Sequence, residues 1–481
     1  MKKNFWNLLF IACAVCACVS CKTGSTDEPS TETTVNSGSD DDLVDNQTWT
    51  TTFAIVWEGA SATVTGEMEG VSISESNGYV TIISSAKEVV YTLSGSGTGQ
   101  VSIYSDYKYQ LSINNLTLSC TDGPAINNQC KKTCFAVISG TNTLSDGTSY
   151  ATTSEDRKAA FFSEGQLSFS GTGTISVTGN YKHALASDDY IRLCEDFGTM
   201  NLTAKASDGM HANDGIIIND GTLNITATGE GIQCDSSSVV VTGGTITISS
   251  KEKAIKSEGD ILISGGTVTA IASGSSAPEG IESKGNIAIT GGTVYTQAND
   301  DAMNAGGELT ISGGTVMAYS TNNDGIDANG NCYIKGGTVY AIGARSPEVG
   351  IDANTEGGYK LYVQGGTLVA IGGLEQNAQL SQDCYSASSI SKGVWYALYN
   401  GDDVAFVFKT PSSLSATSFV VSTSGTTTLK SGVTTNGGTD ILNEYALSGA
   451  TVSGGSSVTL SSYTGQGGGP GGGGPGGGGR H

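Results

Sequence analysis

The middle of the chain repeats a short pattern of turn, threonine, and alternating apolar and polar residues. In each of seven copies, two small or acidic turn residues precede a threonine and an apolar residue, and successive threonines lie 22 to 29 residues apart. These threonines are Thr222, Thr245, Thr267, Thr293, Thr315, Thr338 and Thr367. A period of about 22 residues with short alternating segments is typical of stacked β-coils. Since one coil cannot bury its own apolar side, the pattern predicts a solenoid with a shared core.

Alternation within each coil assigns side chains to the core or to the surface. Ile326 and Ala328 should point inward, whereas Asp327 and Met317 should point outward. Aligning the coils predicts one buried apolar column, which contains Ile281, Met303, Ile326 and Ile351. The fold class expected from this pattern is all-β, a right-handed parallel β-helix with a β lead-in and a β cap.

Composition and periodicity divide the chain into five parts. Residues 1–21 have the pattern of a signal peptide, and residues 22–49 that of a disordered, acidic, Ser/Thr-rich tether. Residues 50–373 should form the β-helix, in which weaker alternating strands precede the regular repeat. Residues 374–464 should form a β cap, because an open solenoid end is an unpaired edge. Residues 465–481 are mostly Gly and Pro and should be a disordered tail.

The first residues resemble a bacterial lipoprotein signal. Lys2 and Lys3 precede a short apolar run that is too short to span a membrane, and the run ends at Cys21. The resemblance implies lipidation of Cys21, with Cys18 as the alternative. We therefore expect a protein of the cell envelope that is lipid-anchored to the outer membrane, surface-exposed, and in contact with the membrane only through its lipid.

The net charge of −23 over 481 residues argues against nucleic acid and anionic membrane surfaces as partners. An acidic exported protein more often binds divalent cations than nucleic acid or anionic membranes. The alternative is that the negative charge only keeps the protein soluble. We expect a monomer.

Seven cysteines follow the signal region. Cys234 and Cys332 have the positions of buried hydrophobic residues. One disulfide could form among Cys120, Cys130 and Cys134, but the sequence does not decide whether it does.

Two outward columns of the aligned coils are rich in carboxylates. Like charges in neighbouring coils, about 4.8 Å apart, are unfavourable without a counter-ion, and oxygen ligands suit calcium. The predicted calcium site contains Asp301, Asn304, Asp324, Asp327 and Asp352. The alternative is an acidic, solvated face beside turns, where Asp and Asn are common.

A further outward column offers aromatic rings to a sugar. The candidate carbohydrate-binding residues are Tyr295, Met317, Tyr319 and Tyr340. Flat rings on a rigid face suit sugar stacking, but Tyr also favours strands for reasons unrelated to any ligand.

Catalytic chemistry has weaker candidates, and no catalytic residue is assigned. His211 lies near Asp208 and Asp214 in the sequence, which suits a catalytic residue or a ligand, but we expect a surface histidine without a role. Lys253 beside Glu279 has the base-and-acid pattern that a lyase needs, but column ion pairing explains this pair too.

Several segments together resemble a known family. Residues 160–164 and 183–188, the repeated Gly-Gly-Thr turns and the Asp-Gly-Ile-x-Ala units are similar to the carbohydrate-binding β-helix family of clostridial cellulose- and pectin-binding proteins. The resemblance covers roughly residues 88–373. It implies a right-handed parallel β-helix related in shape to pectate lyases, with calcium at coil turns. It also implies binding of plant polysaccharide, including acidic pectic chains.

We therefore expect non-catalytic, calcium-supported polysaccharide binding by an envelope lipoprotein. One alternative is a calcium-dependent polysaccharide lyase of the pectate type, which is weakened because no Lys or Arg occurs in either column from Asp301 to Asp352. A structural surface adhesin is the second alternative, and it would need no organised carboxylate cluster.

Overall fold

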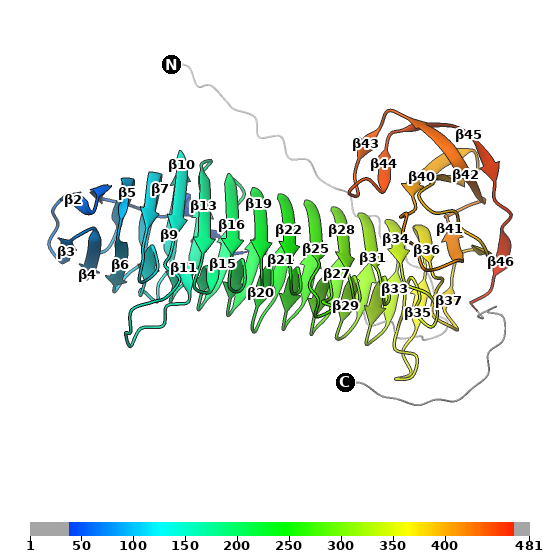
Figure 1. Cartoon of the computed structure of the whole chain (residues 1–481), viewed down its shortest axis with the longest axis horizontal. Coiled ribbons are helices and arrows are strands. Elements are labelled where there is room, and N and C mark those ends of the chain that lie inside the picture. The colour runs from blue at the N-terminus through cyan, green and yellow to red at the C-terminus, as the bar shows by residue number, and fades with distance from the viewer. Residues whose placement is uncertain (1–37, 466–481) are drawn as a thin grey trace, which may run out of the picture. The chain divides into compact units, whose positions relative to one another are not determined.

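The computed structural model describes residues 38–465, which form a parallel β-solenoid with extra sheets at both ends. The predicted all-β, parallel architecture is confirmed. Figure 1 shows the strands of successive coils side by side in chain order. Cys21, the rest of the signal region and the tail beyond Gly465 lie outside the described residues. Within the described part of the chain, no helix is long and apolar enough to span a membrane.

The first face of the solenoid consists of the longer strands, each of which follows a turn and opens on a threonine. Its strands are β10 (Thr141–Ser145), β13 (Thr174–Gly179), β16 (Thr199–Ala204), β19 (Thr222–Ala227), β22 (Thr245–Ser250), β25 (Thr267–Ala272), β28 (Thr293–Ala298), β31 (Thr315–Ser320), β34 (Thr338–Ile342) and β36 (Thr367–Ile371). The repeated threonines form a ladder in register along this face, because Thr222 pairs with Thr245 and each later threonine pairs with the next.

The second face consists of shorter strands that precede the glycine turns. They are β9 (Cys134–Ser139), β12 (Leu167–Ser170), β15 (Tyr190–Leu193), β18 (Gly215–Ile218), β21 (Val239–Val241), β24 (Ile261–Ile263), β27 (Ile287–Ile289), β30 (Leu309–Ile311), β33 (Cys332–Ile334), β35 (Leu361–Val363) and β37 (Gln379–Leu380).

The third face is a separate sheet whose short strands carry the buried apolar column. Its solenoid strands are β6 (Gln100–Ser105), β8 (Ile126–Asn128), β11 (Ala159–Ser163), β14 (His183–Ser187), β17 (Met210–Ala212), β20 (Ile232–Cys234), β23 (Ile255–Ser257), β26 (Ile281–Ser283), β29 (Met303–Ala305) and β32 (Ile326–Ala328). Ile281, Met303, Ile326 and Ile351 are each 0% exposed, so the predicted column is confirmed.

The turn between the second and first faces requires glycine for two reasons. Gly314 has φ +79°, a left-handed conformation that side chains other than glycine rarely adopt. A Cβ atom at Gly314 would also lie 2.7 Å from the carbonyl oxygen of Gly292 in the preceding coil. The Gly-Gly-Thr signature therefore follows from the close stacking of these turns.

The core contains the predicted cysteines as small apolar side chains. Cys234 and Cys332 are 0% exposed, which confirms their interpretation as buried hydrophobic residues. All seven cysteines of the described residues are free, so no disulfide forms among Cys120, Cys130 and Cys134.

Antiparallel hairpins close the N-terminal end. β1 (Thr51–Gly59) pairs with β2 (Ser61–Thr65), and β3 (Val71–Ser76) pairs with β4 (Tyr79–Ser84). β1 and β4 then begin the parallel stack by pairing with β5 (Val89–Thr98) and β6. β5 pairs in turn with β7 (Tyr109–Ser119), which leads into both β9 and β10.

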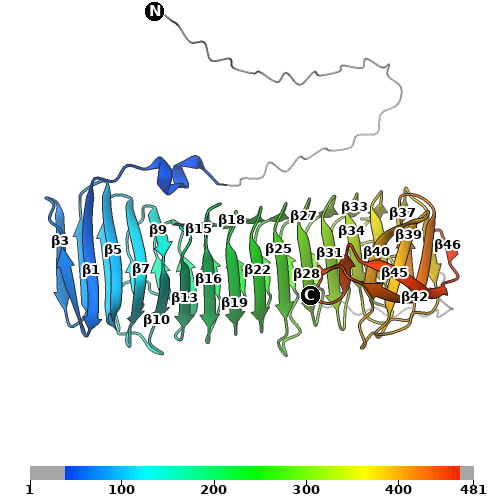
Figure 2. The ribbon, with the colours of Figure 1, turned by 90° about the horizontal axis from the view of Figure 1, so that it is seen from above.

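The described part of the expected tether is not a free linker. Two 3-10 helices, η1 (Asp40–Asp42) and η2 (Val44–Asn46), follow Ser39. Arg192 on β15 donates a hydrogen bond to the carbonyl of Ser39 at 2.7 Å and lies 3.8 Å from the Asp42 carboxylate. Figure 2 shows this segment running along the solenoid. A buried arginine therefore fixes residues that composition alone placed in a tether.

A β cap follows the last coil, as predicted, and begins by pairing with it. β41 (Phe419–Ser422) pairs antiparallel with β36 and with β38 (Cys384–Ala387), which also pairs with β46 (Ser461–Tyr463). The remaining strands form a six-stranded sheet and are β39 (Trp395–Asn400), β40 (Asp403–Lys409), β42 (Thr427–Asn436), β43 (Thr439–Asp440), β44 (Ala446–Ser448) and β45 (Thr451–Ser457). These pairings cover the terminal strand edge of the first face.

Candidate functional site

The outward positions of the third face carry two columns of mostly charged side chains, which we call the ionisable face. One column occupies the middle of successive strands and contains His211, Gln233, Lys256, Glu282, Asn304, Asp327 and Asp352. The other lies three residues earlier in each coil and contains His183, Asp208, Glu230, Lys253, Glu279, Asp301 and Asp324. The register predicted for the first column is confirmed by the strand pairing.

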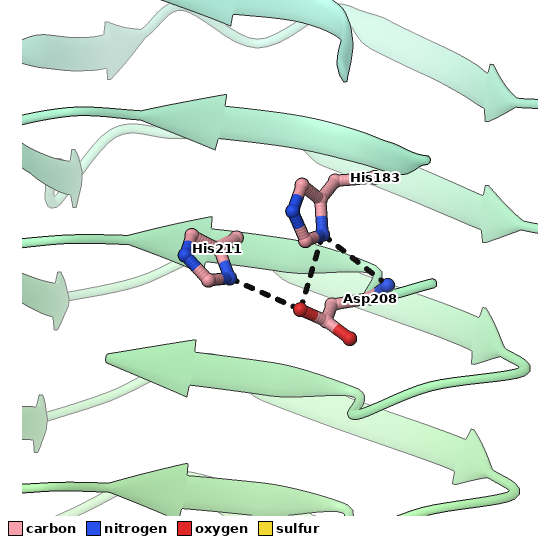
Figure 3. A group of neighbouring side chains, drawn as sticks. All are labelled: His183, Asp208 and His211. Atoms are coloured by element: carbon pink, nitrogen blue, oxygen red, sulfur yellow. Dashed lines mark hydrogen bonds and ion pairs between the residues drawn. The ribbon is translucent and has the colours of Figure 1, made fainter. Parts of the chain in front are cut away.

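Two histidines converge on one carboxylate at the N-terminal end of the ionisable face (Figure 3). Nδ1 of His183 and Nδ1 of His211 each lie 3.0 Å from the same Oδ2 atom of Asp208. The two imidazole rings are stacked with their centroids 4.3 Å apart. All three side chains are buried, so the expected surface position of His211 was wrong.

Neighbouring groups hold this cluster in place. The backbone N–H of Glu230 donates to Oδ1 of Asp208 at 3.0 Å, which leaves Oδ2 facing the imidazoles. Nε2 of His211 lies 3.1 Å from Oδ2 of Asp235. Gln233 in turn donates to the other oxygen of Asp235 at 2.7 Å. Each of these contacts orients a side chain of the cluster or its immediate partner.

The surroundings of Asp208, His183 and Glu230 shift the pKa values of these groups in different directions. Burial would raise the pKa of Asp208, but its hydrogen bonds with His183 and His211 outweigh burial and hold that pKa well below its usual range. Burial lowers the pKa of His183, which favours the neutral imidazole. Burial and the nearby charge of Asp208 raise the pKa of Glu230 to about 7. One carboxylate is therefore ionised while its neighbour titrates near neutrality.

Ion pairs fill the centre of the ionisable face. Nζ of Lys253 lies 3.3 Å from Glu279 and 3.2 Å from Glu282, and Lys284 also pairs with Glu282. Burial would lower the pKa of Lys253, but the two carboxylates outweigh it and raise that pKa above its usual value. A lysine held protonated in this way is a poor general base, so the arrangement favours column ion pairing over lyase chemistry.

Carboxylates without cationic partners occupy the C-terminal part of the ionisable face. The side-chain amide of Asn304 donates to Asp301 at 3.1 Å and to Asp327 at 3.3 Å. The backbone N–H of Asp324 donates to the second oxygen of Asp301 at 3.0 Å. Asp352 continues the same column beside Glu375. In the described part of the chain, none of these carboxylates forms an ion pair with Lys, Arg or His.

Burial raises the pKa values of these acidic groups. The pKa of Asp301 rises to about 8 through burial and the charges of Asp327 and Asp324, and that of Asp324 rises to about 7 mainly through burial. Burial raises the pKa of Asp327 to about 6, and burial with Glu375 raises that of Asp352 to about 9. Exposed carboxylates would be ionised at neutral pH. Because these groups are buried or half-buried, protonation competes with a bound cation.

One group of side chains has the geometry of a metal site. Within residues 38–465, His183, Asp208 and His211 form the one group of three or more His, Cys, Asp or Glu side chains whose ligand atoms all lie within 4.8 Å of one another. This buried group could hold a metal ion. The predicted calcium residues lie along the same face but do not converge in this way.

The expected aromatic platform is not exposed. Tyr295, Met317 and Tyr340 are at most 1% exposed, and Tyr319 is 4% exposed. Their side chains point away from the solenoid core, as alternation predicted, but they enter a second apolar core together with Phe408 and other cap residues. The cap thus covers the rings that were expected to stack on a sugar.

The part of the first face that the cap leaves uncovered has polar, uncharged outward side chains, and we call this surface the polar face. Its outward residues on four successive strands are Thr174, Ser176, Thr178, Thr199, Asn201, Thr203, Thr222, Asn224, Thr226, Thr245, Thr247 and Ser249. Asn224 donates to Asn201 at 2.9 Å, and Asn201 donates to Ser176 at 3.2 Å. Hydroxyl and amide groups therefore recur in register from coil to coil, about 4.8 Å apart.

Sequence reasoning missed His183 and Asp235. His183 lies well before Thr222, where the regular repeat begins, so the predicted columns did not include it. Ala186 pairs with His211, so His183 occupies the position of Asp208 in the preceding coil. Extending the alignment by one coil would have brought the two histidines together.

The chain is similar to a known protein family and to a solved structure. A search of curated proteins finds no significant match. The chain is similar to a solved structure of the polysaccharide lyase-like protein from C. thermocellum, a gadolinium derivative, with 16% sequence identity and a TM-score of 0.32. That similarity covers 65% of this chain and 96% of the other. Residues 76–325 match the family described as carbohydrate-binding domain-containing protein. Since this match spans more than half of the sequence, the chain belongs to the carbohydrate-binding domain-containing protein family.

Proposed function

We propose that this protein binds polysaccharide without cleaving it, and that the polar face is the main contact surface. The observation that carries the proposal is the position of this face. It lies within the residues that match the carbohydrate-binding family, and the cap does not cover it. Rows of hydroxyl and amide groups can both donate to and accept from sugar hydroxyls along an extended chain. Because the face itself is uncharged, it adds no local repulsion of acidic ligands to that of the net charge of −23.

The test is a glycan-array measurement on the parent protein and on two threonine variants. Thr247→Glu places a charge on β22, the last strand of the polar face, and should weaken binding at least tenfold. Thr63→Glu makes the same change at an exposed strand position outside the family match and should bind like the parent. Equal binding by the two variants contradicts the assigned surface. Release of unsaturated sugar products from any bound glycan would instead support a lyase.

Calcium support forms a second part of this proposal. The acidic groups from Asp301 to Asp352 are buried or half-buried without cationic partners, and calcium would satisfy oxygen ligands there. A bound cation would also reduce repulsion of acidic glycans. Repeating the glycan array with a chelator tests this part separately, since neutral glycans should keep their binding and acidic glycans should lose it.

We also propose that the protein is anchored in the cell envelope through a lipid on Cys21. Lys2, Lys3 and the short apolar run before Cys21 support this assignment. Mass spectrometry of the mature N-terminus should find a lipidated Cys21. An unmodified Met1, or a lipid on Cys18, contradicts it.

A further inference from the structure

We infer that His183, Asp208 and His211 bind a divalent late first-row transition metal, with zinc as the representative ion, at a site separate from any calcium on the acidic part of the ionisable face. The inference does not depend on the proposed glycan binding. It rests on donor geometry, on the groups that orient the donors, and on the chemistry of imidazole.

The three donor atoms are already close to a coordination geometry. Both Nδ1 atoms lie 3.0 Å from Oδ2 of Asp208. Zinc bonds of about 2.0–2.2 Å in a tetrahedral arrangement place neighbouring donors roughly 3.3 Å apart. All three ligand atoms lie within 4.8 Å of one another, so modest side-chain shifts would admit the ion. Figure 3 shows the three side chains converging; His183 lies on β14, His211 on β17 and Asp208 in the turn before β17.

The surrounding contacts have the pattern that orients metal ligands. A metal-bound histidine commonly donates its other ring N–H to a carboxylate, which fixes the ring and its tautomer. Nε2 of His211 meets Oδ2 of Asp235 at 3.1 Å, and Gln233 holds that carboxylate. The backbone N–H of Glu230 likewise holds Oδ1 of Asp208 and leaves Oδ2 free to bind.

Without a metal, the hydrogen bonding of the histidines is incomplete. A single oxygen, Oδ2 of Asp208, faces both Nδ1 atoms, and the backbone N–H of Asp208 also lies 3.4 Å from Nδ1 of His183. Nε2 of His183 is buried and has no hydrogen-bond partner, and His183 is 2% exposed. A cation bound to both Nδ1 atoms and to Oδ2 would give each of these three converging atoms its own bond, whereas Nε2 of His183 would remain a buried donor without an acceptor.

The donor set selects the class of metal. Imidazole nitrogen suits zinc, copper and nickel, whereas calcium takes six to eight oxygen ligands. The His183 cluster supplies two nitrogens and one carboxylate, so it should prefer zinc to calcium. Partial exposure of the His211 side chain, at 10%, leaves a side from which the ion and a water ligand can enter.

The experiment measures metal binding by the full chain. Protein purified in chelator and dialysed is titrated with Zn²⁺ by calorimetry, and with Co²⁺ by visible absorption, which reports nitrogen ligation. We expect one Zn²⁺ per chain, a Co²⁺ spectrum of low coordination number, and no displacement by millimolar calcium. His211→Gln should weaken Zn²⁺ binding at least 100-fold, and Asp235→Asn should weaken it about tenfold.

Two control variants and the parent itself keep the inference falsifiable. His481→Gln removes the third histidine of the chain, and Asp324→Asn alters the acidic part of the ionisable face; both should bind Zn²⁺ like the parent. If His211→Gln does not fold, the number of Zn²⁺ ions bound per parent chain and the Co²⁺ spectrum of the parent still test the site. No tight Zn²⁺ binding by the folded parent, a weak spectrum of all-oxygen ligation, or unchanged binding by a folded His211→Gln would overturn the site.

Discussion

The hydroxyl of Tyr340 donates a hydrogen bond to the backbone carbonyl of Lys409 at 3.1 Å. Tyr340 points outward from β34 of the solenoid, and Lys409 ends β40 of the cap, 69 residues later. Tyr319 and Ser413 make a similar hydroxyl contact at 3.2 Å. The outward tyrosines therefore attach the cap to the first face and have a structural role in this arrangement.

Replacing Tyr340 by alanine should destabilise the protein without altering its glycan selectivity. The change removes a fully buried ring and its hydrogen bond, which costs about 3–5 kcal/mol. Thermal unfolding measures the loss of stability, and the glycan array measures selectivity. Tyr359→Ala, at a side chain that is 45% exposed, is the control and should change stability by no more than about 0.5 kcal/mol. A folded Tyr340→Ala variant that loses glycan binding would restore a direct role for the ring.

The buried apolar column should not tolerate a charge. Ile326→Asp places an unpaired carboxylate at a position that is 0% exposed, so it should cost several kcal/mol or prevent folding. Ile83→Asp makes the same substitution at a side chain that is 59% exposed and should have little effect. Chemical denaturation of both variants measures the difference. Similar stabilities would mean that the coil register is wrong.

The solenoid could be predicted from sequence because its geometry requires the repeated residues. Gly314 must adopt a left-handed conformation and lie against the backbone of the preceding coil, so the Gly-Gly-Thr turns marked every later coil. Alternation then placed Ile326 inward and Asp327 outward. Both assignments depend only on local geometry and on a constant repeat.

The covering of the aromatic column and the histidine cluster depend on contacts between distant segments. Alternation indicated that Tyr340 leaves the solenoid core, but it could not show whether solvent or a later segment meets the ring. Likewise, His183 and His211 meet only because two coils with an irregular connection pair in register. Burial of Asp301 also followed from neighbouring turns, and this burial changed the expected protonation of the acidic column.

In the absence of calcium, stability should fall as pH rises from about 4 to 8. Burial raises the pKa of Asp301 from 3.8 to about 8, so the folded state holds a proton that the unfolded chain has already released. Because the folded state binds more protons in this range, rising pH favours unfolding. Asp301→Asn should flatten this decline and raise the melting temperature at pH 8. Melting curves in chelator at several pH values measure the effect.

A matched substitution separates this effect from a general change in charge. Asp402→Asn removes one negative charge at an exposed turn and should leave the pH dependence as it is in the parent. If Asp301→Asn and Asp402→Asn give the same pH profile, Asp301 does not hold a proton in the folded protein.

Calcium should counteract the loss of stability at pH 8. Once Asp301, Asp324 and Asp327 are ionised, their repulsion favours a bridging cation with oxygen ligands. Binding to the folded state alone raises stability by about 2.7 kcal/mol when calcium is at 100 times its dissociation constant. The rise should be smaller at pH 5, where protons compete. Thermal unfolding in chelator and in millimolar calcium at both pH values measures this response.

Two variants locate the calcium response. Asp324→Ala combined with Asp327→Ala should abolish it, whereas His211→Gln should keep it, because the histidine cluster prefers a different class of metal. A parent whose melting temperature ignores calcium at pH 8 would rule out calcium support. A double variant that retains the full response would move the ion to the Glu230, Asp235 and Glu258 region, where the same face also carries carboxylates. Loss of the response in both variants would mean that calcium binds at the histidine cluster or acts on the whole face.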